Sequence, residues 1–230
     1  GLMLAVLRQT VRADRMLRTG QWGKWSLRLE CFELYGKTVG LVGCGAIGRE
    51  VARRLAPFGV RLLYAERYRL DPELERELGL SYVDLPTLLS MADVVSLHVP
   101  LLEENRHLID AQALSQMKPT AVLINTSRGG VVDEQALVTA LERRAIAGAG
   151  LDVFAQEPLP PDHPLLRLDN VVLAPHLGGA TVDTFRRTVR KALENIRRFD
   201  AGLDPFPEDI LIPRPERRIH GADRDSRSAG

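Results

Sequence analysis

Three charged side chains follow directly on apolar stretches of this 230-residue chain. They are Arg128 in "INTSRGG", Glu157 in "LDVFAQEPLP" and His176 in "VVLAPHLGGAT". A guanidinium pairs with both oxygens of a carboxylate, and an imidazole transfers protons near neutral pH. A carboxylate beside the imidazole fixes its tautomer and stabilises its protonated form. These are the groups that reduction of a 2-oxo acid by hydride transfer requires.

Each of these side chains also has a purely structural interpretation when it is taken alone. Arg128 could be a solvated loop residue, Glu157 a surface residue held by Pro158, and His176 a turn residue after a strand. Their positions after three successive apolar runs, downstream of a glycine-rich turn, favour the chemical interpretation. Because ligands of open parallel sheets bind at the carboxyl ends of the strands, we expect the three groups to converge there.

The glycine-rich turn is "LVGCGAIG", in which Gly43, Gly45 and Gly48 have the G-x-G-x-x-G spacing. The first glycine permits a tight turn, the second lets a pyrophosphate approach the backbone, and the third lets the helix pack on the strand. The motif follows an apolar run and opens an amphipathic stretch, as it requires. It predicts a dinucleotide bound at the N-terminus of a helix.

An acidic residue, Glu66, ends the next apolar run in "YAERYRL". A carboxylate in this position accepts hydrogen bonds from the adenosine ribose and repels a 2′-phosphate, which favours NAD over NADP. The neighbouring Arg67 and Arg69 point the other way, because arginines beside the ribose accommodate a phosphate. A surface glutamate without a ligand is the remaining interpretation.

Short apolar runs alternate with helical patterns from residue 37 onward. Continuously apolar runs suit strands that are covered on both faces, and helices between them make the crossovers of a parallel sheet. The fold class predicted is therefore α/β, a doubly wound and mostly parallel Rossmann sheet. The predicted strands lie at residues 37–43, 60–65, 93–99, 121–127, 147–153 and 170–174, and the predicted helices at 46–59, 72–79, 85–92, 133–148 and 181–202.

The same patterns divide the chain into three parts. Residues 1–180 are predicted to form the dinucleotide-binding domain, opening with a helix over 1–22 that is already under way at Gly1, which indicates that an upstream portion is absent. Residues 181–212 form a helix and a proline-rich segment. Residues 213–230 are highly charged with few apolar groups, and we expect disorder there.

The overall composition excludes several classes of protein. The 31 basic and 30 acidic residues are mixed along the chain, which argues against a nucleic-acid surface. No apolar run reaches the roughly 18 to 20 residues that span a bilayer. The two cysteines, Cys31 and Cys44, do not suggest a disulfide, and no Cys/His cluster has metal-ligand spacing. We expect a cytoplasmic protein with no metal.

The motifs "VGCGAIG", "LHVPL", "INTSRGGVVDE", "GAGLDVFAQEPLP" and "APHLGGAT" occur in an order that resembles the D-isomer-specific 2-hydroxyacid dehydrogenases, from residue 1 to about residue 212. The resemblance implies an NAD-dependent enzyme in which Arg128 clamps the substrate carboxylate, His176 is the acid/base and Glu157 its partner. It also implies a homodimer contact at the opening helix. Residues 181–212 would return to a second, flavodoxin-like substrate domain that is largely missing.

The resemblance also assigns cofactor contacts. Ala46 and Ile47 would lie at the pyrophosphate, and Ala46 replaces a residue that is often Arg or His in the family. Glu66, where many members have Asp, would bind the adenosine ribose. The full set implied for the cofactor is Gly43, Gly45, Ala46, Ile47, Gly48, Glu66, Val99, Pro100, Asn105, Thr126, Ser127, Arg128, Asp152, His176 and Gly179, with Asp152 on the nicotinamide carboxamide.

Two other functions remain open at this point. An NADH-sensing binding protein, similar to the C-terminal binding protein corepressors, would retain the same three charged residues. A dehydrogenase of formate or phosphite is the other alternative, because "YAERYRL" is similar to that branch. Among the other histidines, His98 packs or lines the cofactor cleft, while His107, His163 and His220 show no partner pattern.

Overall fold

The computed structural model describes residues 1–210 and contains one seven-stranded sheet in unit Gly1–Gly179. The strand order is β3-β2-β1-β4-β5-β6-β7, and every neighbouring pair is parallel. The order reverses between β1 and β4, which is where open α/β sheets bind their ligands. The strands are β1 (Thr38–Val42), β2 (Arg61–Ala65), β3 (Leu80–Tyr82), β4 (Val94–Leu97), β5 (Val122–Asn125), β6 (Gly148–Leu151) and β7 (Val171–Leu173).

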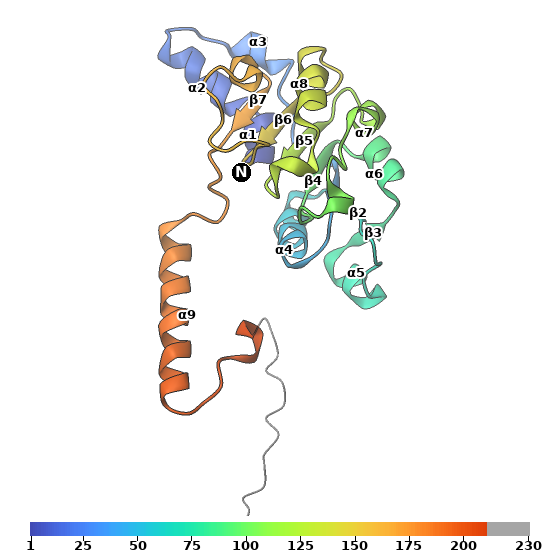
Figure 1. Cartoon of the computed structure of the whole chain (residues 1–230). Helices are drawn as coiled ribbons and strands as arrows, with labels where there is room; N and C mark the ends of the chain where they lie inside the picture. The colour runs from blue at the N-terminus through green and yellow to red at the C-terminus, as the bar shows by residue number, and fades with distance from the viewer. Residues whose placement is uncertain (211–230) are drawn as a thin grey trace, which may run out of the picture. The chain divides into compact units, whose positions relative to one another are not determined.

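Helices cover both faces of this sheet (Figure 1). Side chains alternate along each strand, so that Val94 and Val95 of β4 belong to opposite hydrophobic cores. One core includes side chains of α6 (Leu85–Met91), α7 (Ala111–Gln116) and α8 (Glu134–Glu142). The other includes side chains of α1 (Leu2–Leu7), α4 (Ala46–Leu55) and α5 (Pro72–Leu78). The predicted α/β parallel sheet is confirmed.

Four consecutive helices of the sheet unit, α5 to α8, begin at an aspartate. Asp71, Asp84, Asp110 and Asp133 each accept a hydrogen bond from a backbone N–H in the first turn of α5, α6, α7 and α8. Such caps satisfy donors that have no partner inside the helix. Helix α4, like the three helices that precede it in the chain, has no side-chain cap, and its N-cap is Gly45. The N-terminal end of α4, at the carboxyl edge of β1, therefore has no capping side chain.

The opening segment departs from the prediction of one helix over 1–22. Gln9 adopts a left-handed backbone conformation, with φ of 52°, and divides the segment into α1 and α2 (Thr10–Arg18). Met3, Val6 and Leu7 of α1 are buried against the sheet, whereas α2 has no buried residue. A further short helix, α3 (Lys24–Arg28), follows. Burial of one face of α1, and not helical periodicity alone, therefore sets the break.

Other boundaries differ less. The helix predicted at 46–59 ends at Leu55 and continues as a 3₁₀ turn over Ala56–Phe58, and the one predicted at 133–148 ends at Glu142. Strand β3 and helix α7 were not predicted. Both are short, which weakens any periodic signal.

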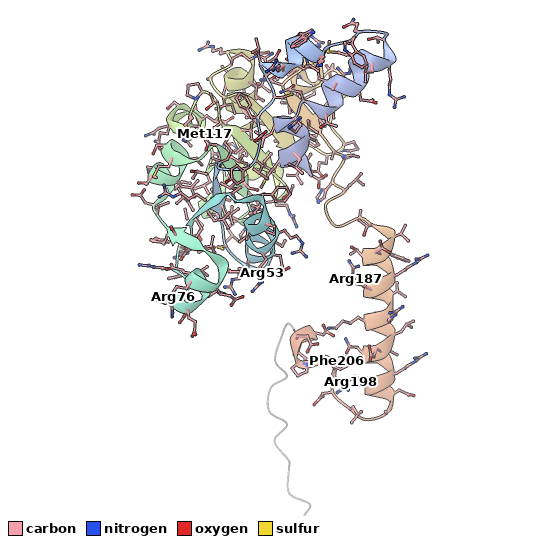
Figure 2. The ribbon with its side chains drawn as sticks, turned by 180° about the vertical axis from the view of Figure 1, so that it is seen from behind. Arg53, Arg76, Met117, Arg187, Arg198 and Phe206 are labelled. Atoms are coloured by element: carbon pink, nitrogen blue, oxygen red, sulfur yellow. The ribbon has the colours of Figure 1, made fainter. Side chains whose placement is uncertain are left out.

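Of the described residues, 180–210 belong to a second compact unit. Its helix α9 (Val182–Asp200), capped by Thr181, corresponds to the helix predicted at 181–202. The segment after α9 folds back on it, with Lys191 bound to Glu208 and the Arg198 guanidinium 4.4 Å from the Phe206 ring (Figure 2). The tail predicted to be disordered at 213–230, and His220 within it, lie outside the described residues. Within residues 1–210, no helix is long and apolar enough to cross a membrane.

Candidate active site

The glycine turn connects β1 to α4 and is shaped by close backbone contacts. Gly43 has a φ of 91°, and a Cβ on it would lie 2.8 Å from the backbone of His98. A Cβ on Gly48 would lie 2.5 Å from the Gly43 carbonyl oxygen. A Cβ on Gly45, in contrast, would meet nothing within 4 Å. Open backbone at Gly45, together with the uncapped start of α4, fits the pyrophosphate of a dinucleotide.

The end of β2 places Glu66 beside this turn. Its Oε2 accepts a hydrogen bond from the Cys44 N–H at 2.8 Å, and its Oε1 accepts one from the Arg67 N–H at 3.1 Å. Glu66 also lines a cleft of about 460 Å³ together with Val99, Pro100 and Asn105. The Asn105 side chain donates to the Pro100 carbonyl at 3.1 Å, which joins two of these lining residues. Four of the residues implied for the cofactor, Glu66, Val99, Pro100 and Asn105, thus line one cleft.

Both arginines next to Glu66 are paired with other carboxylates. Arg67 reaches the two oxygens of Glu104 at 2.9 and 3.1 Å. Arg69 binds Glu75 through two hydrogen bonds of 2.8 Å, and Glu75 also accepts one from the Tyr64 hydroxyl. The hydrogen bonds from Arg69 and Tyr64 lower the pKa of Glu75 to about 2. Among the described ion pairs, no arginine neutralises Glu66, and none neutralises Asp84, which lines the same cleft.

A second cleft, also about 460 Å³, is lined by Thr126, Asp152, His98 and Gly178. The two carboxylate oxygens of Asp152 accept the backbone N–H groups of Leu177 and Gly178, at 2.8 and 2.7 Å. The structure thus places Asp152 as a support of the loop after β7. Burial lowers the pKa of His98 to about 4, and its Nε2 lies 3.0 Å from the Ser96 hydroxyl. His98 both packs and lines the cleft.

His176 lies in the loop that Asp152 supports. Its backbone has a φ of 55°, and its N–H donates to the Asp152 carbonyl at 2.8 Å. The imidazole Nδ1 is 2.8 Å from Oε2 of Glu157, while Oε1 of Glu157 accepts the Phe154 N–H at 3.0 Å. Since Nδ1 is held by the carboxylate, Nε2 is the nitrogen that can face a reactant. The two residues lie 19 positions apart in the chain.

Arg128 extends from the end of β5, next to the segment that carries Glu157. Its backbone is extended, and its guanidinium donates to the Ser127 carbonyl at 2.7 Å. The next residue, Gly129, lies so close to Phe154 that a Cβ would be 1.9 Å from the Phe154 carbonyl oxygen. The hydrogen bonds from His176 and from the Phe154 N–H, and the charge of Arg128, lower the pKa of the Glu157 carboxyl. The structure therefore gathers all three charged side chains at one edge of the sheet.

The remaining predicted residues are placed less uniformly. Ala46 and Ile47 are exposed in the first turn of α4, and Gly179 is exposed with open space where a Cβ would be. Ser127 is buried, and its hydroxyl donates to Asn125 at 2.9 Å, so that it faces the protein interior. Sequence reasoning overlooked Asn125, whose side chain also donates to the Arg128 carbonyl. Its position at the end of β5, two residues before Ser127, is the signal that could have found it.

Comparison with known proteins places this geometry in a family. Residues 1–178 match the model described as "D-isomer specific 2-hydroxyacid dehydrogenase, NAD binding domain". The chain belongs to the D-isomer specific 2-hydroxyacid dehydrogenase family. The resemblance in the sequence motifs is thereby confirmed, and the sheet unit is the NAD(P)-binding domain of this family.

Relatives within the family are similar over nearly the whole chain. The chain is 51% identical to a glyoxylate reductase of Thermofilum pendens over 95% of its residues, and 50% identical to one of Korarchaeum cryptofilum over 93%. It spans 66% of the length of both relatives. Among solved structures, the TT0316 protein of Thermus thermophilus superposes with a TM-score of 0.80 at 44% identity, covering 89% of this chain and 64% of that one.

Proposed function

We propose that the whole protein transfers a hydride between NAD(H) and a small 2-hydroxy or 2-oxo acid, with glyoxylate as the first substrate to test. The observation that carries this proposal is the 2.8 Å contact between His176 Nδ1 and Glu157, next to Arg128. It unites the groups needed for a 2-oxo acid at the edge of a dinucleotide-binding sheet. Two relatives at 50% identity or more are glyoxylate reductases, which supports the same substrate class.

In this proposal the three charged residues have separate tasks. Arg128 pairs with the substrate carboxylate through its planar guanidinium. His176 donates the proton on Nε2 to the carbonyl oxygen as that oxygen gains negative charge, and it accepts the proton back in the oxidation direction. Glu157 orients the ring through Nδ1 and stabilises the imidazolium. When bound, NADH would supply the hydride that, together with this proton, converts a 2-oxo acid to a 2-hydroxy acid.

We infer a preference for NAD over NADP from the charges around Glu66. A 2′-phosphate at the ribose would meet this carboxylate, while Arg69 and Arg67 are engaged by Glu75 and Glu104. We propose cofactor contacts for the residues that the resemblance in sequence implied. They are Gly43, Gly45, Ala46, Ile47, Gly48, Glu66, Val99, Pro100, Asn105, Thr126, Ser127, Arg128, Asp152, His176 and Gly179. For Asp152 the backbone contacts of the structure add a second task, since it holds the loop that carries His176.

Exposed apolar side chains in two segments of the chain suggest partners. Helix α9 has a row of exposed apolar residues that includes Phe185, Leu193 and Phe199, and we propose that it belongs to a flavodoxin-like substrate domain in the whole protein. Trp22 and Trp25 are exposed near α3, and we propose that this region contributes to a homodimer. A cytoplasmic location stays a prediction.

Two measurements test the proposed function. Titration of the 230-residue chain with NADH and NADPH, followed by nicotinamide fluorescence, should show tighter binding of NADH. The whole protein should oxidise NADH when glyoxylate or another small 2-oxo acid is added, and Arg128→Lys should raise KM because the bidentate contact is lost. Tight NADH binding with no turnover on a panel of 2-oxo acids would contradict the enzyme and favour a sensing role.

A further inference from the structure

A second pair of histidine and glutamate lies close to the proposed catalytic one. His163 Nε2 is 3.2 Å from Oε1 of Glu134, in the first turn of α8. The side chains are only 18% and 16% exposed, respectively. The sequence motifs "VVDE" and "DHP" that contain these residues have no task in the proposed reaction. The structure nevertheless gives both residues several partners.

Both nitrogens of His163 are engaged. Its Nδ1 accepts the Leu165 N–H at 3.3 Å and so caps the 3₁₀ turn Pro164–Arg167. An acceptor at Nδ1 places the proton of the neutral ring on Nε2, which then donates to Glu134. His163 therefore acts as a fixed donor to one oxygen of Glu134.

The other oxygen of Glu134 holds the segment that carries Glu157. Oε2 accepts the Ala155 N–H at 3.0 Å, and the adjacent Phe154 N–H donates to Glu157 at 3.0 Å. Gly129 supports the same segment, because its backbone lies against the Phe154 carbonyl with no room for a Cβ. Two successive backbone N–H groups thus bind two different glutamates, of which one is shielded and one faces His176.

We propose that Glu134 is a positioning residue, which fixes the 154–157 segment with the help of His163 and thereby sets the contact between Glu157 and His176. The inference rests on the proposed function for the role of Glu157 in the reaction. Hydrogen bonds to a charged group are stronger than neutral ones, so an ionised Glu134 holds Ala155 more firmly than a neutral acceptor does. Small displacements of a catalytic group reduce the rate steeply.

Amide hydrogen exchange in the 230-residue chain, followed by NMR, tests the structural part. In Glu134→Ala the Ala155 amide should exchange about tenfold faster, because it loses a bond to a charged acceptor. The decisive readout is the Phe154 amide, which should also exchange faster, together with a rise in the pKa of Glu157 toward its ordinary value. Glu142→Ala, at the exposed end of the same helix, is the matched control and should change neither amide.

The conservative variant Glu134→Gln separates positioning from general loss of stability. Its single amide oxygen can still accept the Ala155 N–H, but its NH2 group then faces the Nε2–H of His163, so exchange at Phe154 should fall between that of the wild type and that of Glu134→Ala. This variant also keeps the test valid should Glu134→Ala fail to fold. Wild-type exchange at Phe154 and an unchanged pKa of Glu157 in Glu134→Ala, with Ala155 alone affected, would overturn the inference. Exchange at Phe154 as fast in a folded Glu134→Gln protein as in Glu134→Ala would overturn it as well.

Steady-state kinetics of the whole protein distinguish this inference from the proposed function. Glu134→Ala should lower kcat about tenfold with little change in KM, because Arg128 still binds the substrate. If Glu157→Gln keeps the wild-type kcat, the proposed role of Glu157 is wrong, whereas the exchange at Phe154 still decides the positioning by Glu134. If Glu157→Gln lowers kcat and Glu134→Ala does not, only the positioning inference fails.

Discussion

The two imidazole–carboxylate pairs of this domain use the same residue types in opposite ways. In the His176–Glu157 pair the side chains are 49% and 37% exposed, and the carboxylate holds Nδ1 alone. In the His163–Glu134 pair both ring nitrogens have partners within the chain. An imidazole ring that uses one nitrogen for a partner in the chain can exchange a proton with a ligand through the other nitrogen. A ring whose two nitrogens both have partners in the chain supports structure. The partners of the second nitrogen therefore separate the two roles.

The backbone shows the same contrast. His163 has a relaxed extended conformation, with φ of −60° and ψ of 136°, as is common for a residue that caps a helix. His176 has a φ of 55°, a backbone conformation that residues other than glycine rarely adopt. Such strain persists where the surroundings hold it, and it is often found at functional sites. At His176 the holding group is Asp152, through the bonds to residues 176–178.

The largest expected effect separates the two pairs by rate. His176→Ala should lower kcat of the whole protein by about 10²- to 10⁴-fold, as loss of a general acid does. His163→Ala should lower it far less, because His163 acts only through Glu134. Steady-state assays with NADH and glyoxylate measure both. Equal losses in the two variants would remove the distinction.

The packing between the pairs should be sensitive to a single methyl group. Gly129→Ala places a Cβ 1.9 Å from the Phe154 carbonyl, so the segment that carries Glu157 must move. Overpacking of this kind lowers the free energy of unfolding by about 1–3 kcal/mol. Urea denaturation of the 230-residue chain measures it, with Gly179→Ala as the control, since a Cβ there meets nothing within 4 Å. A Gly129→Ala protein as stable as wild type would show that this contact is loose.

For stability, the order of the two histidine variants should be the reverse of the order expected for the rate. His163→Ala should lower the free energy of unfolding by about 1–2 kcal/mol, because Glu134 and the Leu165 N–H each lose a partner in a shielded place. His176→Ala removes a half-exposed ring and should change it by less than about 0.5 kcal/mol. Denaturation of the two variants under one set of conditions provides the comparison. A larger loss for His176→Ala would contradict it.

The smallest expected effect concerns pH. The hydrogen bond from His176, followed by that from the Phe154 N–H, lowers the pKa of Glu157 below its ordinary value. The interaction is therefore fully present above the ordinary pKa of a glutamate and is lost as the pH falls through the lowered value. Carboxyl ¹³C NMR titration should show the low midpoint in wild type and a higher one in His176→Ala. Identical midpoints would indicate that the pair does not form in solution.

Local sequence patterns predicted the structural features that depend on the order of residues within short stretches of the chain. The apolar runs at β1, β4 and β5 and the glycine spacing at residues 43–48 were sufficient for the sheet, because strands covered on both faces must be apolar throughout. The order of the motifs also indicated that Arg128, Glu157 and His176 belong together. Their convergence follows from the parallel sheet, which brings strand ends to one edge whatever lies between them.

Features that depend on distant contacts were not predictable. Gln9 breaks the opening helix because α1 packs on the sheet, which no periodicity in the segment reveals. The partner of His163 lies in α8, on the far side of β6 in the chain, so that the two residues share no local pattern. Likewise, the engagement of Arg67 by Glu104 depends on a loop that follows β4. The sequence suggested that Arg67 and Arg69 could accommodate a phosphate beside Glu66. In the structure, each of them is paired with another carboxylate.

The turn between β1 and α4 is braced from two sides by the protein itself. The His98 backbone lies against Gly43, and the Glu66 carboxylate holds the Cys44 N–H. A receptor whose backbone is already in its bound shape loses little conformational entropy on association. Recognition of a dinucleotide by this turn should accordingly resemble the docking of two rigid bodies, with an association rate set by diffusion and orientation and with no slow rearrangement step.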